Sequence, residues 1–307
     1  MGRTALFSRH QPGGVFTVSD LVGHPGDIWF VDSGSATGAD GAGYGRNPDK
    51  PFLTLDYAVG LCAANNGDVI YVMPGHAENL AADSDVDVDV AGVKIVGLGW
   101  GGSRPTFTAT AIAGDFKLAA PCCWIENLLF LSGVDATTGL LEISAADTTV
   151  INCEFRDSVD QATDMVVALD GSDRLLMDEC TFTMAAGAGA NSAIAIVSSD
   201  DAEIKNFNIY GNFAVGGIDL RTTASARINI HSGKIWTANA ADIAIVDTIT
   251  GSTGFIGPDI EIMLTDNAAN ITEAVTGATF QLMDPVYVCN LAGEKGMLID
   301  WTASTDA

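Results

Sequence analysis

The chain has 307 residues, and its 14 Lys and Arg residues against 39 Asp and Glu residues give a net charge of −25. Contacts with phosphates need clustered Lys and Arg, so we expect no direct binding to nucleic acid and no docking on an anionic membrane. Apolar residues make up 48% of the chain and charged residues 17%. This composition excludes a disordered protein and predicts a large buried core.

No apolar run approaches the roughly 18 residues that are needed to span a bilayer. No apolar segment follows the two arginines of residues 1–10, so no secretory signal is visible. The six cysteines are scattered except for the adjacent pair Cys122-Cys123, and no CxxC motif occurs. We therefore expect small buried thiols in a protein made in a reducing cytoplasm, without a structural zinc site.

The first 26 residues carry no strand pattern of the kind found later in the chain, and they include the pair Gly13-Gly14. This segment is less acidic than the rest of the chain, and Arg3, Phe7 and Arg9 are its candidate contacts with an acidic neighbour. The sequence predicts either a frayed tail or an attachment arm over residues 1–26 that becomes ordered on a partner. We favour the arm.

Residues 52–64 carry the best helical pattern, with Leu53, Ala58, Leu61 and Cys62 as an apolar face. Elsewhere, short runs rich in Val, Ile, Phe and Thr are separated by Gly, Asp, Asn and Ser, which are strand and turn signals. The sequence therefore predicts an all-β chain with one short helix.

An acidic run at residues 83–90 places Asp85, Asp87 and Asp89 on one face of a predicted strand. Three carboxylates in a row repel one another, and a cation such as Ca²⁺ or a basic partner would relieve that repulsion. We favour a plain outward face in water, with a cation or a basic partner as the alternative. We expect no cofactor, and these three residues are the candidate metal ligands.

A repeat of about 26 residues organises the middle of the chain. Its marker positions follow one another at steps of 25, 27, 27, 26 and 27 residues: Phe130, Phe155, Phe182, Ile209, Ile235 and Ile262. Apolar residues recur two, five and seven positions before most of the markers, whereas the residue just before a marker is polar in five of six cases. This in–out alternation, repeated once per period, predicts short strands at fixed places in each repeat.

A corner is predicted three residues before each marker, because the alternation changes phase there. Asn127, Asn152 and Asn206 occupy this position in three of the repeats. Asparagine tolerates the left-handed backbone conformation that a sharp corner needs, and stacked corners can hydrogen-bond along the column.

Stacking is the physical meaning of the repeat, since one coil of about 26 residues cannot bury its own apolar side. Coils stacked about 4.8 Å apart pair each strand with the next coil and fill a tube with like side chains. We predict a right-handed parallel β-helix over residues 27–264, with the short helix near residues 52–64 as a cap. A β-sandwich is the rival fold, but it gives no reason for a constant period.

Residues 265–307 break the repeat but still contain strand patterns, such as residues 280–283 and 286–291. An open end of a β-helix exposes unpaired strand edges, which need a cover. We therefore assign residues 265–307 to a cap and a contact between subunits.

The opening of the chain resembles that of right-handed parallel β-helix proteins of the pectate-lyase-like group. The resemblance rests on the order of WFVDSGSATGADG at residues 29–41, PFLTLDYAV at 51–59 and GDVIYVMPGHAE at 67–78, and on the asparagine column. The segments Val-Asp-Ser-Gly and Pro-Gly-His-x-Glu resemble segments found in proteins of tailed bacteriophages. In those proteins the fold serves in tailspikes and other virion surface components, commonly as trimers.

The adjacent pair Asp200-Asp201 resembles the Asp pair of polygalacturonase-like enzymes, which makes it the candidate catalytic pair. The remaining motifs of that family, Asn-Thr-Asp and Gly-His-Gly, do not occur in the chain. We interpret the pair as a solvated turn between strands, with catalysis as the alternative.

The resemblance implies a non-enzymatic structural protein on the surface of a bacteriophage capsid, a decoration or spike made in the host cytoplasm. It implies a homotrimer that binds the major capsid protein or another virion protein through its N-terminal arm. A tailspike that binds or cleaves a host surface glycan is the alternative, and a bacterial polysaccharide lyase or hydrolase is a third. The sequence leaves enzymatic activity open, and we expect none.

Overall fold

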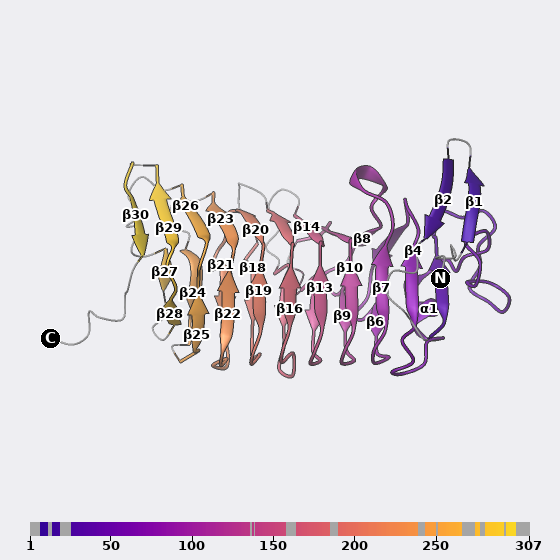
Figure 1. The fold of residues 1–307 in the computed structure, drawn as a ribbon, viewed down its shortest axis with the longest axis horizontal. Coiled ribbons are helices and arrows are strands. Elements are labelled where there is room, and N and C mark those ends of the chain that lie inside the picture. The colour runs from indigo at the N-terminus through magenta and orange to yellow at the C-terminus, as the bar shows by residue number, and fades with distance from the viewer. Residues whose placement is uncertain are drawn as a thin grey trace, which may run out of the picture.

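The chain winds into a rod of stacked coils in which three parallel sheets run along the length (Figure 1). The computed structural model describes residues 7–11, 14–18, 26–135, 137, 139–157, 164–184, 190–238, 243–249, 251–265, 274–276, 280–291 and 293–298. In each full coil the chain passes from sheet 1 to sheet 2 to sheet 3. The predicted parallel β-helix is confirmed.

The sheets of the described residues contain 10, 10 and 8 strands. Sheet 1 contains β3 (Ile28–Val31), β4 (Val69–Val72), β7 (Lys94–Gly97), β10 (Trp124–Glu126), β13 (Thr149–Ile151), β16 (Leu176–Asp178), β19 (Glu203–Lys205), β22 (Ile228–His231), β25 (Gly254–Ile256) and β28 (Phe280–Leu282). Sheet 2 contains β5 (Ala77–Leu80), β8 (Thr106–Ala109), β11 (Leu129–Ser132), β14 (Glu154–Arg156), β17 (Thr181–Thr183), β20 (Asn208–Gly211), β23 (Gly233–Thr237), β26 (Ile260–Leu264), β29 (Val286–Asn290) and β30 (Lys295–Leu298). Sheet 3 contains β6 (Val86–Val88), β9 (Phe116–Leu118), β12 (Leu141–Ile143), β15 (Val166–Ala168), β18 (Ser192–Ile196), β21 (Gly216–Leu220), β24 (Ile243–Asp247) and β27 (Val275–Thr276).

The six marker residues of the repeat lie in register on consecutive strands of sheet 2 and are buried. The ring centroids of Phe130 and Phe155 are 5.0 Å apart, those of Phe155 and Phe182 are 4.7 Å apart, and both pairs are nearly parallel. Phe107 extends this stack by one coil on its N-terminal side. The ring separations match the distance between neighbouring strands, so coil stacking itself sets the aromatic packing.

The corner between sheet 1 and sheet 2 has a left-handed residue in each of these six coils. The six residues are Asn127, Asn152, Glu179, Asn206, Ser232 and Asp259, with φ between 50° and 60°. The Asn127 amide donates hydrogen bonds to the carbonyl oxygens of Gly97 at 2.7 Å and Gly99 at 3.0 Å. Asn152 in turn donates to the side-chain oxygen of Asn127 at 3.5 Å. The corner side chains therefore tie neighbouring coils together.

Sheet 3 was not apparent from the sequence repeat. The strands β15, β18 and β21 are buried at every residue, on their outward side as well as their inward side. Such strands show no alternation of apolar and polar residues, which is the signal that revealed sheets 1 and 2.

The N-terminal end of the rod is covered by α1 (Leu55–Val59), whose residues Leu55, Ala58 and Val59 are buried. This helix is shorter than the predicted segment 52–64. Leu61 lies beyond it and is exposed, so it does not belong to the apolar face. None of the helices in the described ranges is long and apolar enough to cross a membrane.

Strands lie at both ends of the chain, and those at the N-terminal end form a separate two-stranded sheet. β1 (Phe7–Gln11), which contains Phe7 and Arg9, pairs antiparallel with β2 (Gly14–Val18), whereas Arg3 lies outside the described residues. At the other end, β27, β28 and β29 continue the three sheets in parallel within segment 265–307. The final strand β30 then pairs antiparallel with β29.

Replacement of Phe155 by Ala tests whether the stack stabilises the rod. The free energy of unfolding should fall by about 3–5 kcal/mol, because a buried ring is lost and a cavity remains between two coils. Phe255 is 49% exposed on β25 and provides the control, since Phe255→Ala should cost less than about 1 kcal/mol. Urea titration monitored by circular dichroism gives both values, and equal losses would contradict the stacking account.

Candidate functional site

One outward row of sheet 3 contains three of the four carboxyl groups of the described chain whose pKa is raised. The strand register aligns one residue from each of seven sheet-3 strands, β6, β9, β12, β15, β18, β21 and β24. These residues are Asp87, Lys117, Glu142, Val167, Ala195, Asp219 and Val246. We call these seven residues the sheet-3 row. Its charged members form an N-terminal group around Lys117 and a central group at Asp219.

The N-terminal group places one lysine among several carboxyl groups. Lys117 Nζ lies 4.0 Å from Glu142 Oε2, and the register puts Asp87 on the opposite side of Lys117. Burial raises the pKa of Glu142, and the nearby Asp115 adds to that shift. Burial likewise raises the pKa values of Asp87 and Asp115. Carboxyl groups that keep a proton to higher pH are suited to general-acid chemistry.

The three candidate metal ligands of residues 83–90 do different things in the structure. The Asp85 carboxylate accepts hydrogen bonds from the backbone N–H groups of Ala81 and Ala82, Asp87 lies in the sheet-3 row, and Asp89 is exposed. Among the described residues, no group of three His, Cys, Asp or Glu side chains could hold a metal ion.

The central group is a network of buried charges. Arg221 donates to Asp164 Oδ2 and, at 3.4 Å, to Asp219 Oδ2. Ser192 Oγ donates to Asp164 Oδ1 at 2.6 Å. Asp219 is only 1% exposed, and its Oδ1 atom is buried without a hydrogen-bond partner.

The environment of Asp219 favours its neutral form. Burial raises the pKa of Asp219 to about 6, and the neighbouring Asp164 adds to the shift although Arg221 opposes it. An ionised carboxylate whose oxygen is buried without a hydrogen-bond partner has lost the stabilisation that water would give. Protonation neutralises the group and removes most of this cost in free energy. Perturbed groups of this kind gather at functional sites, which makes the row the leading candidate site of this chain.

The candidate catalytic pair Asp200-Asp201 lies at another corner, between sheet 3 and sheet 1. Arg227 binds Asp201 through two hydrogen bonds, of 2.5 and 2.7 Å, and reaches Asp200 Oδ2 at 3.4 Å. Two coils earlier, Arg174 binds Asp147 in the same way. The four corner residues Asp147, Arg174, Asp201 and Arg227 all have φ near 60° and alternate in charge along the rod.

This corner column gives Asp201 a structural environment. The hydrogen bond from Arg227 lowers the pKa of Asp201, the reverse of the shift that a general acid needs. Asp200 accepts a hydrogen bond from the Ala226 backbone N–H at 2.8 Å. The pair is therefore engaged in holding one coil to the next.

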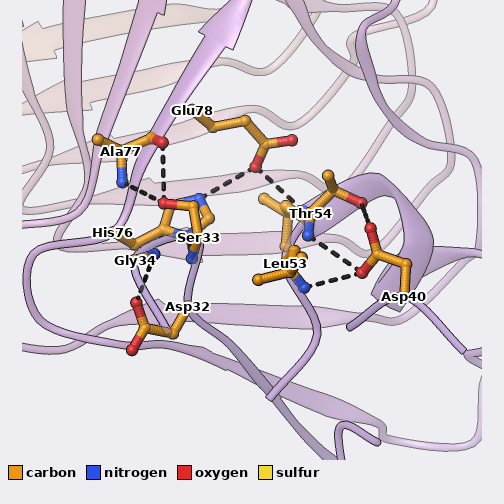
Figure 2. A network of polar contacts seen from close by, with 10 residues as sticks. Asp32, Ser33, Gly34, Asp40, Leu53, Thr54, His76, Ala77 and Glu78 are labelled. Atoms are coloured by element: carbon orange, nitrogen blue, oxygen red, sulfur yellow. Dashed lines mark hydrogen bonds and ion pairs between the residues drawn. The ribbon is translucent and has the colours of Figure 1, made fainter. Parts of the chain in front are cut away.

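A second polar network, shown in Figure 2, joins the N-terminal cap to the first coils. The Ser33 backbone N–H donates to His76 Nδ1 at 3.0 Å, which leaves the proton on Nε2 to bind Glu78 at 3.0 Å. Glu78 also accepts from the Leu55 N–H at 3.1 Å, at the start of α1. Asp40 accepts three further hydrogen bonds from Leu53 and Thr54.

Comparison with known proteins supports the fold. The solved structure of a rhamnogalacturonan lyase is similar over 90% of this chain and 85% of that chain, with a TM-score of 0.52 and 10% sequence identity. The chain has the pectate-lyase-like parallel β-helix fold. At this identity the likeness carries the fold alone. The sequence matches no family model and no curated protein.

The central group was missed by sequence reasoning, and the N-terminal group was found only through Asp87. Asp164, Asp219 and Arg221 are separated by up to 57 residues, and strand β21, which holds Asp219, shows no alternation. The repeat predicts that these three residues are neighbours only when the register of the sheet-3 strands is known.

Asp219→Asn tests the buried carboxyl group through the pH dependence of stability. The folded state keeps the Asp219 proton up to about pH 6, whereas the unfolded state releases it near the ordinary value of 3.8. The wild-type protein should therefore lose about 3 kcal/mol of stability relative to Asp219→Asn as the pH rises from about 4 to about 6. Above this window the difference should be constant.

Urea titration of both proteins across this range measures the effect. The other titrating groups cancel in the difference between the two proteins. A difference that does not change with pH would show that Asp219 titrates normally.

Proposed function

We propose that this chain is a non-enzymatic structural protein of a bacteriophage virion, a trimeric β-helical decoration or spike on the capsid surface. The support is the contact between the two segments that resemble phage proteins. Val31-Asp-Ser-Gly contributes Ser33, Pro74-Gly-His-x-Glu contributes His76 and Glu78, and both meet in the network of Figure 2.

This network explains why the two segments go together. His76 is buried and is fully used by Ser33 and Glu78, while Glu78 also binds the start of α1. The residues thus join the loop after β3, the cap helix and β5 at the end of the rod that carries β1 and β2 (Figure 1). A rigid end next to an attachment arm suits a protein that stands on a larger particle.

The corner column supports a structural role as well. Asp200 and Asp201, the residues that suggested catalysis from the sequence, pair with Arg227 and stabilise coil stacking. Under this proposal the partners are the major capsid protein or another virion protein at the arm, and further copies of this chain along the rod. The place of action is the virion surface, after synthesis in the host cytoplasm.

Deletion of residues 1–26 tests the role of the arm. The truncated rod should keep its circular dichroism spectrum and its cooperative unfolding, because the stacked core begins at β3. It should fail to sediment with particles that lack this protein, whereas the full chain should bind them. Attachment of the truncated rod at the same level would refute the arm, and Asp201→Asn on the full chain provides a control that keeps the arm intact.

The second candidate is a tailspike-type protein that binds or cleaves a host glycan. The observation in its favour is the set of carboxyl groups with raised pKa values in and beside the sheet-3 row, since glycoside cleavage uses a protonated carboxyl group together with an ionised one. In this second candidate function, Glu142 or Asp219 is the general acid that protonates the leaving-group oxygen.

Incubation with host surface polysaccharide separates the two candidates. Under the structural proposal, the wild-type protein releases no reducing ends and no unsaturated products. If products appear, the activity should fall by at least about 100-fold in Glu142→Gln or Asp219→Asn and persist in Asp200→Ala. That result would establish the second candidate and refute the first.

A further inference from the structure

We infer that the C-terminal half of the outer face of sheet 2 is a surface on which a second copy of this chain docks. The inference deepens the proposed function, because it names the surface through which copies on a virion associate. It rests on exposed aromatic side chains, on a pocket beside them, and on the charge of this face compared with the rest of the chain.

Large apolar side chains gather on this face near the end of the rod. Trp236 on β23 is 51% exposed, Tyr287 on β29 is 52% exposed, and Met297 on β30 is 40% exposed. Tyr287 and Met297 lie opposite each other in the strand register. Figure 1 shows β23, β26, β29 and β30 following one another toward the C-terminal end. We call Trp236, Tyr287 and Met297 the apolar strip.

Contacts within the chain hold the Trp236 side chain of the strip in place. The Trp236 indole N–H donates to Thr265 Oγ1 at 3.0 Å, and its ring packs edge-on against Tyr210 with 5.9 Å between centroids. A pocket of about 630 Å³ lies on the neighbouring strands, lined by Glu261, Ile262, Tyr287, Cys289, Lys295 and Met297 among others. An exposed aromatic side chain that lines a pocket, as Tyr287 does here, is typical of the few residues that dominate a protein interface.

The charge of sheet 2 points to a copy of the same chain as the occupant. Its strands contain three acidic and three basic residues, which cancel: Glu78, Glu154, Glu261, Arg156, Lys234 and Lys295. The strands of sheet 3 contain four acidic residues and one basic residue, and those of sheet 1 contain three acidic and two basic residues, so sheet 2 is the one sheet of the described rod whose strand charges cancel. Two copies that each carry a charge of −25 repel each other, and a neutral face reduces that repulsion where they meet.

An ion pair within the chain places both signs of charge on this face. Lys234 Nζ and Glu261 Oε2 lie 2.8 Å apart, and both side chains are mostly exposed beside the strip. The face therefore presents both signs of charge around an apolar centre. A second copy can therefore place a charge of either sign against its opposite on this face, in a heterologous contact of the kind that closes a trimer.

Sedimentation equilibrium of the full chain tests the inference without any virion. The wild-type protein should associate, and the double substitution Trp236→Ser with Tyr287→Ser should weaken association at least about tenfold, since aromatic anchors carry much of the binding energy. Both side chains are half exposed, so circular dichroism and the midpoint of urea unfolding of the dissociated chain should remain close to those of the wild type.

Matched control substitutions are available on other faces. Phe255 on sheet 1 is 49% exposed, and Ile112, between β8 and β9, is 61% exposed. Phe255→Ser with Ile112→Ser should leave association unchanged. A monomeric wild type, or equal effects of the two double variants, would overturn the inference. Loss of glycan binding with unchanged association in the strip variant would reassign the strip to a glycan.

This experiment is independent of where the protein acts. Association through the strip in a protein that is absent from virions would refute the proposed function and leave the inference standing. If the protein is present in virions but its association does not depend on the strip, the inference is refuted and the proposed function stands.

Discussion

The spacing between stacked coils is the constraint on which the structure depends. Neighbouring strands in a sheet lie about 4.8 Å apart, so every side chain in the interior contacts its counterpart in the coils before and after it. Phe130, Phe155 and Phe182 meet this constraint as a stack of parallel rings, and the isoleucines of the following coils continue the column. Like residues recur because like shapes pack at this distance.

The same constraint acts on charges at the surface. Residues at equivalent corners are also neighbours, so a column of like charges would repel along the rod. The corner between sheet 3 and sheet 1 alternates acidic and basic residues from Asp147 to Arg227. This explains why Asp201, which looks like part of an acidic pair in the sequence, is an ion-pair partner in the fold.

The sheet-3 row departs from this balance. Raised pKa values at Asp87, Glu142 and Asp219 have burial as their first cause, and Asp219 keeps an unpartnered oxygen. The charges at the corner between sheets 3 and 1 are ion-paired. The carboxyl groups of the sheet-3 row, in contrast, are desolvated at a cost in free energy. The sheet-2 face is neutral and apolar by contrast, so the two outer faces differ in the partners that their chemistry fits.

The sequence by itself determined the coil, because the repeat of about 26 residues and the in–out alternation of sheets 1 and 2 follow from local patterns. It also indicated the left-handed corners at Asn127, Asn152 and Asn206, where the alternation changes phase. Only the tertiary structure decided the candidate site. Strands β15, β18 and β21 of sheet 3 are buried on both sides and show no alternation, and Asp164, Asp219 and Arg221 meet through coil stacking over up to 57 residues of sequence. Contacts across coils depend on register, and register is a property of the folded rod.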